Sequence, residues 1–76
     1  MKIQFDKLEN VANQISREFE VMDGDNCIYL RFGYWDRLSI EKFKSLKETF
    51  SRFIINEILV DDDDDCGPLW MYQIKD

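Results

Sequence analysis

The sequence predicts an α+β fold, a single small domain in which an antiparallel sheet of three to four strands carries two helices on one face, in the order α-β-β-α-β-β. Two stretches space their apolar residues as amphipathic helices do, and each precedes segments with the alternation and turn residues of paired strands. The chain has 76 residues, of which 45% are hydrophobic and 34% charged. This composition is that of a folded chain, and the length fits one domain, residues 1–76, with a small core.

The first helix is predicted from a stripe of apolar residues with helical spacing: Leu8, Val11, Ala12, Ile15 and Phe19. Asp6 is the expected N-cap, and Glu9 stands three residues later, as in a capping box. The residues also leave open a short additional strand over Met1–Phe5.

The segment from Glu18 to Tyr34 predicts a β-hairpin with Gly24-Asp25 as a two-residue turn. This register pairs apolar residues on one face and opposite charges on the other: Val21 with Ile28, Phe19 with Leu30, Glu20 with Tyr29 and Glu18 with Arg31. It directs Ile28, Leu30, Phe32 and Tyr34 toward the helices, and Tyr29 and Trp35 away from them.

A second helix follows, with Ser39 as the expected N-cap and a stripe made of Ile40, Phe43, Leu46, Phe50, Phe53 and Ile54. Aspartates at a helix C-terminus would face the negative end of the helix dipole. We therefore end the helix near Ile55, with Asn56 as the C′ residue. Strands are then expected over Glu57–Asp61 and Leu69–Ile74, joined by an acidic loop that contains Gly67 and Pro68. The alternative extends the helix to about Leu59 and leaves three strands.

A faint internal repeat accompanies this assignment. An offset of about 39 residues, read from the printed sequence, superposes Glu18, Val21, Cys27 and Leu30 on Glu57, Val60, Cys66 and Leu69. An α-β-β unit used twice would give the four-stranded sheet.

Several residue types and patterns are missing, which narrows the function classes. The chain has no histidine, the commonest general base and metal ligand. Its 2 cysteines cannot complete a structural zinc site. Without a phosphate-binding loop, a signal peptide or a long apolar run, we expect a cytoplasmic protein that is not an enzyme and binds no cofactor or metal. Cys27 and Cys66 are expected as free thiols, with a disulfide between them as the alternative.

The run Asp61, Asp62, Asp63, Asp64 and Asp65 is the strongest candidate for a binding site. Calcium binding is disfavoured, because Tyr34 and Tyr72 stand where EF-hand loops beginning at Asp23 or Asp61 need a bidentate Glu. A solvated loop is the ordinary interpretation of such a run. The functional interpretation is a site for an Arg/Lys-rich surface on another protein.

Aromatic residues accompany the aspartates. The segment from Leu69 to Ile74 is apolar on both faces of a strand, and two helices cannot cover both faces of the sheet. An exposed aromatic surface usually marks an interface, so Trp35, Trp70, Tyr72 and Tyr29 join the aspartates as expected partner-binding residues.

In size, acidity and lack of catalytic residues, the chain resembles small acidic inhibitors of nucleic-acid-handling enzymes, such as phage-encoded anti-CRISPR and anti-restriction proteins. That resemblance implies a phage- or mobile-element-encoded inhibitor whose partner is a basic nucleic-acid-handling protein or complex. Nucleic acid and membranes are not expected as direct partners, because the formal net charge is −6. Toxin-immunity proteins share this character, and a homodimer or larger homo-oligomer that buries the aromatic sheet face is a further alternative.

The negative charge is concentrated in one part of the chain. Residues 1–55 hold nine basic and nine acidic side chains, whereas residues 56–76 hold one basic and seven acidic ones, a net charge of −6. We therefore expect a neutral body with one acidic edge.

Overall fold

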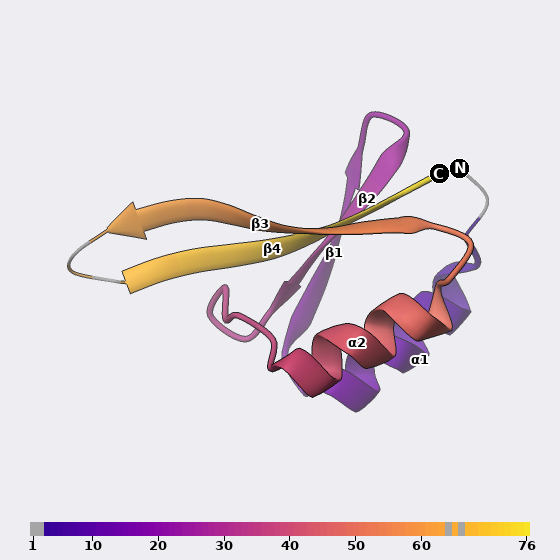
Figure 1. Ribbon diagram of the computed structural model, residues 1–76, viewed down its shortest axis with the longest axis horizontal. Coiled ribbons are helices and arrows are strands. Elements are labelled where there is room, and N and C mark those ends of the chain that lie inside the picture. The colour runs from indigo at the N-terminus through magenta and orange to yellow at the C-terminus, as the bar shows by residue number, and fades with distance from the viewer. Residues whose placement is uncertain (1–2, 64, 66) are drawn as a thin grey trace.

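The computed structural model describes residues 3–63, 65 and 67–76. Within them the chain forms α1 (Phe5–Ile15), β1 (Phe19–Gly24), β2 (Cys27–Phe32), α2 (Ile40–Thr49), β3 (Ile54–Asp63) and β4 (Gly67–Lys75). The strands make one antiparallel sheet in the order β1-β2-β4-β3, and α1 and α2 lie on the same side of it (Figure 1). The predicted α+β class and the element order are confirmed.

The sheet joins two α-β-β halves at its centre. Each half supplies one hairpin, β1-β2 or β3-β4, and the hairpins meet where β2 pairs with β4, from Cys27–Lys75 to Leu30–Tyr72. The repeated order of elements agrees with the repeat seen in the sequence. The offset is not uniform, because β1 and β3 begin at Phe19 and Ile54, whereas β2 and β4 begin at Cys27 and Gly67.

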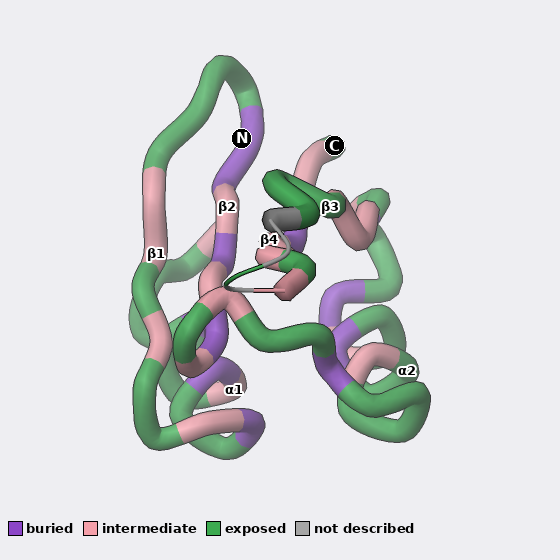
Figure 2. The backbone as a smooth tube through the Cα atoms, turned by 90° about the vertical axis from the view of Figure 1, so that its left-hand side faces the viewer, coloured by how far each residue is buried: buried purple, intermediate pink, exposed green. Residues whose placement is uncertain are grey.

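The core lies between the sheet and the helices, where the buried parts of the backbone face one another (Figure 2). Alternate residues of β2 and β4 point into it, which is the period of a strand with one buried face. Its members come from both helices, the segments directly before and after α2, and three strands: Leu8, Ala12, Ile15, Ile28, Leu30, Phe32, Leu38, Leu46, Phe50, Ile55, Tyr72 and Ile74.

The first hairpin forms in a different register from the predicted one. Val21 pairs with Leu30 and Gly24 with Cys27, so the turn is Asp25-Asn26 rather than Gly24-Asp25. Asn26 takes the left-handed conformation with φ 56°, which asparagine tolerates better than most residues. Gly24 lies in the strand with the Tyr29 ring close to it. A Cβ at this position would come within 2.5 Å of that ring, so the absence of a side chain leaves room for it. A shift of two residues keeps the paired side chains on their predicted faces. Tyr34, which was predicted to face the helices, lies beyond the end of β2 and is 67% exposed.

The start of α1 differs from the prediction. The helix begins at Phe5 after Gln4, whose side chain makes no capping hydrogen bond, so Asp6 lies inside the first turn rather than at the N-cap. There its negative charge still faces the positive end of the helix dipole. Ile3 and Gln4 precede the helix outside any strand, so the optional strand is absent from the described part of Met1–Phe5.

The predicted N-cap of α2 is confirmed, and its predicted end is wrong. The Ser39 side chain accepts a hydrogen bond from the backbone N–H of Lys42, at 3.2 Å. The helix ends at Thr49, well before Ile55, because Ile55 is buried in the sheet opposite Ile74. Of the predicted stripe residues, Ile54 therefore lies in β3 and is 51% exposed, while Ile40, the first residue of α2, is 88% exposed.

The second hairpin is longer than predicted, and the alternative three-stranded sheet is excluded. β3 runs from Ile54 to Asp63 instead of from Glu57 to Asp61, and β4 already includes Gly67 and Pro68, which were expected in the loop. Pro68 is tolerated because β2 does not reach this part of β4, so no neighbouring strand on that side needs its missing N–H.

Candidate functional site: a projecting acidic hairpin

The far end of β3 and β4 projects beyond the rest of the sheet. Pairing between β2 and β4 stops at Leu30–Tyr72, whereas β3 and β4 stay paired from Ile54–Lys75 out to Asp63–Gly67. Residues 59–63 of β3 and 67–70 of β4 therefore form a two-stranded ribbon, the projecting hairpin, that leaves the body of the molecule (Figure 1). A ribbon of this kind can enter a concave surface on another molecule.

Apolar and acidic side chains stand next to each other on this hairpin. A bulge between Leu59 and Asp61 leaves Val60 without a pairing partner on β4. Leu59 and Val60 are each 46% exposed, and Asp61 and Asp62 follow them directly, also exposed. Four consecutive residues thus present an apolar pair and then an acidic pair to solvent.

The described contacts leave the first two aspartates available to a partner. The Asp61 side chain accepts a hydrogen bond from the backbone N–H of Asp62, at 2.8 Å. Among the described residues, neither Asp61 nor Asp62 forms an ion pair. Asp65 is exposed, the backbone of Asp63 belongs to β3, and Asp64 and Cys66 lie outside the described residues.

The base of the hairpin is held by the loop after β2. The backbone N–H of Trp70 donates a hydrogen bond to the carbonyl of Trp35, at 2.7 Å. The Arg37 guanidinium lies over the Trp70 ring, 4.6 Å from its centroid, and its Nη2 is 3.0 Å from the Glu57 carboxylate. A cation over an indole face and an ion pair to a mostly buried carboxylate together fix the direction in which the hairpin leaves the body.

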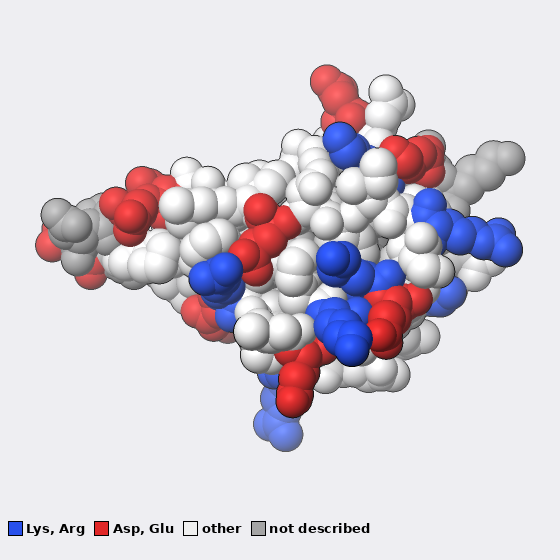
Figure 3. Space-filling view, viewed as in Figure 1, with Lys and Arg blue, Asp and Glu red and all other residues white. Residues whose placement is uncertain are grey.

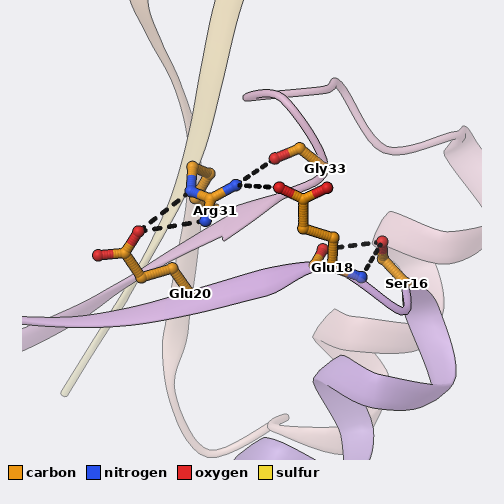
Figure 4. Close-up of polar contacts among 5 residues, drawn as sticks. All are labelled: Ser16, Glu18, Glu20, Arg31 and Gly33. Carbon is orange, nitrogen blue, oxygen red and sulfur yellow. Dashed lines mark hydrogen bonds and ion pairs between the residues drawn. The ribbon is translucent and has the colours of Figure 1, made fainter.

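A second arginine supports the same loop from the neighbouring strand. Arg31 on β2 lies between two glutamates, 3.1 Å from Glu20 and 3.5 Å from Glu18, and also donates to the carbonyl of Gly33 (Figure 4). Its guanidinium carbon is 5.8 Å from the centroid of the Trp35 ring. The predicted attraction between Glu18 and Arg31 is present, although Arg31 pairs across the strands with Glu20.

Tyr72 does not belong to the exposed surface. It is fully buried, its hydroxyl accepts a hydrogen bond from the backbone N–H of Leu38 at 2.7 Å, and it donates one to Glu57 at 2.9 Å. Burial, together with the neighbouring Glu57 carboxylate, raises the pKa of this hydroxyl. The expectation that Tyr72 contacts a partner is corrected: it is the polar centre of the core.

Tyr29 lies on the sheet face opposite the helices, as the alternation predicts. Its hydroxyl is 3.4 Å from the amide nitrogen of Gln73, whose oxygen in turn accepts a hydrogen bond from Asn56 at 3.1 Å. Cys27, a free buried thiol, lies at the end of this row, 3.7 Å from the Gln73 amide. A hydrogen bond with Cys27 raises the pKa of the Tyr29 hydroxyl. The row spans β2, β4 and β3. It therefore lies on the body of the sheet and not on the projecting hairpin.

The structure thus brings together some of the predicted site residues and separates others. Trp35 and Trp70, 35 positions apart in the sequence, meet at the base of the acidic hairpin, and both are half-buried. Sequence reasoning missed Leu59, Val60, Arg37 and Glu57. The first two belong to the apolar run Ile58-Leu59-Val60, and its position directly before the aspartates is the one signal that could have marked them.

The surface charge differs between the projecting hairpin and the part of the molecule around α2. Acidic side chains occupy the end of the projecting hairpin, and lysines and arginines gather, with some acidic neighbours, over the part of the molecule where α2 lies (Figure 3).

The described residues contain no group of three or more His, Cys, Asp or Glu side chains placed to bind a metal ion. In the same part of the chain, no helix is long and apolar enough to cross a membrane.

The fold and the site together define an α+β protein with a projecting acidic hairpin. No family model, curated protein sequence or solved structure matches this chain.

Proposed function

We propose that this protein works by binding another protein, and that its projecting hairpin docks on a basic, nucleic-acid-binding surface and blocks it. The observation that carries the proposal is the exposed sequence Leu59-Val60-Asp61-Asp62, which runs outward from the base of a ribbon that leaves the body. An acidic pair beside an apolar pair is suited to a surface that offers arginine or lysine side chains around an apolar patch.

The anchored base of the hairpin supports this role. Because the Trp35 carbonyl and the Arg37 guanidinium hold Trp70, the hairpin keeps its direction before a partner arrives. Preorganisation of this kind lowers the entropy that binding costs. The half-buried rings of Trp35 and Trp70 would form the rim of the contact. The function is then that of an inhibitor of the anti-CRISPR or anti-restriction type, acting without catalysis.

The test is affinity capture from a lysate of the source cells, with the immobilised protein as bait and the retained proteins identified by mass. The Asp61→Asn/Asp62→Asn variant removes two negative charges and keeps the oxygen that accepts the Asp62 N–H. We expect the wild type to retain a basic protein that duplex DNA displaces, and the variant to lose it.

The matched control is Asp23→Asn/Asp25→Asn, which removes the same charge from the other hairpin, where both side chains are also exposed. We expect this control to behave as the wild type. If all three baits retain the protein equally, the hairpin is not the binding site. If DNA does not displace the retained protein, the surface that the hairpin blocks is not a nucleic-acid-binding surface.

A further inference from the structure

The outer face of α2 carries an apolar groove with basic walls. Ile40, at 88%, is the most exposed large apolar side chain of the described residues. Together with neighbours along the same face of the helix it lines a groove of about 450 Å³, formed by Ile40, Phe43, Lys44, Lys47, Glu48 and Ser51. The Phe43 ring forms the floor, since it packs on Tyr72 with a centroid distance of 5.4 Å.

The groove and the projecting hairpin carry opposite charges. The groove is lined by two lysines and one glutamate, a net charge of +1, whereas residues 59–70 hold five acidic side chains and no basic one. Within one copy, no ion pair among the described residues joins Asp61 or Asp62 to Lys44 or Lys47. In the groove, Lys47 Nζ lies over the Phe43 ring, 5.3 Å from its centroid, so Lys47 has to move aside for an apolar side chain to reach that ring.

The two surfaces also match in spacing. Along β3, the sequence from Leu59 to Asp62 spans about 10 Å, at roughly 3.3 Å for each residue. Along α2, the distance from Ile40 to Lys47 is also about 10 Å, at roughly 1.5 Å for each residue. An apolar pair followed by an acidic pair thus covers the same length as an apolar pair followed by a basic pair. Because consecutive side chains of a strand point to opposite faces, Asp61 and Asp62 would reach the basic side chains from the two sides of the ribbon.

We propose that the hairpin of one copy docks in the α2 groove of a second copy. Leu59 and Val60 lie against Ile40 and Phe43, while Asp61 and Asp62 approach Lys44 and Lys47. The contact joins two different surfaces, so it is heterologous. It is also small, and the association is therefore weak and sensitive to salt. This inference does not rest on the proposed function, although a basic partner with higher affinity would compete for the same hairpin.

The test is sedimentation velocity of the pure protein over a range of concentrations, from about 10 to 500 µM, at low and high salt. We expect the average sedimentation coefficient to rise with concentration at low salt and to stop rising at high salt. Lys44→Glu/Lys47→Glu and Asp61→Lys/Asp62→Lys should each stay monomeric alone. An equimolar mixture of the two variants should associate again, because each then offers the surface that complements the other.

Two further variants keep the result interpretable. Lys44→Gln/Lys47→Gln removes the charges without reversing them and should weaken association by at least threefold. Arg17→Glu/Arg52→Glu changes the net charge as much as the first variant but lies outside the groove, and it should associate as the wild type does. A monomer at every concentration would overturn the proposal. Association that survives the lysine substitutions, or a charge-swapped mixture that stays monomeric, would also overturn it.

Discussion

Tyr72 connects three parts of the molecule through one hydroxyl group. It lies on β4, accepts from the backbone of Leu38 before α2, and donates to Glu57 on β3, which also pairs with Arg37. Its ring packs between Phe32 and Phe43, with centroid distances of 5.9 and 5.4 Å. The same side chain therefore fills the core and satisfies a buried backbone donor.

Replacing Tyr72 by Phe should lower the free energy of unfolding by about 1–3 kcal/mol, because the Leu38 N–H loses its acceptor inside the protein. Urea denaturation at pH 7 measures the change. Tyr34→Phe is the control, since Tyr34 is 67% exposed and should change stability by less than about 0.5 kcal/mol. Equal stability of the two variants would contradict the role assigned to Tyr72.

The raised pKa of Tyr72 also predicts how stability depends on pH. In the folded protein the hydroxyl stays neutral above the ordinary pKa of 10.0, whereas in the unfolded chain it ionises there. The unfolded state therefore loses a proton first, and the stabilisation by Tyr72 is complete below about pH 10 and declines above it. Urea denaturation between pH 8 and about 11 should show a steeper decline for the wild type than for Tyr72→Phe. Parallel curves would contradict the assignment.

Tyr72 also illustrates what the sequence could not reveal at the residue scale. The segment Leu69 to Ile74 is apolar at nearly every position, so alternation alone did not decide which side chains face the helices. The pairing of Tyr72 with Leu30 decides it. Tyr29, in a segment whose alternation is clear, was placed on the correct face.

At the scale of elements, capping was predictable at one helix and not at the other. Ser39 has the ordinary N-cap chemistry and performs it, whereas α1 begins at Phe5 without a side-chain cap although Asp6 follows. The end of α2 depends on tertiary pairing, because residues 54–55 are needed opposite β4. Local helix signals cannot report such a competition between a helix and a sheet.

Ser39→Ala should lower the free energy of unfolding by about 1 kcal/mol, since the backbone N–H of Lys42 loses its acceptor. Thermal or urea denaturation measures it. Ser45→Ala, at an exposed position inside the same helix, is the matched control and should be neutral or slightly stabilising. A loss of stability in the control equal to that of Ser39→Ala would contradict the capping role.

The projecting hairpin was predictable in its chemistry but not in its shape. The aspartates and the preceding apolar run are visible in the sequence, and a loop was the expected structure. Instead, β3 continues past Asp61 as far as the pairing of Asp63 with Gly67. Cross-strand hydrogen bonds to β4 stabilise an extended conformation that a run of like charges would not adopt alone.

At the scale of the whole molecule, charge is separated along the fold. The α2 segment is positive and the β3-β4 segment is negative, so the molecule presents two surfaces of opposite charge. This separation of charge follows from the order of the elements. The basic residues lie in and around α2, and most of the acidic residues lie in the β3-β4 segment that follows it. Sequence counts alone placed the negative charge in residues 56–76, but they did not reveal that it projects from the body or that a basic groove lies on α2.

The most direct test of the central claim is the affinity of the captured basic protein for Asp61→Asn/Asp62→Asn relative to Asp23→Asn/Asp25→Asn, measured by titration at one salt concentration. Because both variants lose the same net charge, long-range attraction changes equally and the ratio reports the local contact. We predict that the hairpin variant binds roughly tenfold more weakly, about 1.4 kcal/mol for two lost charge contacts. Equal affinities of the two variants would contradict the claim that the projecting hairpin is the binding site.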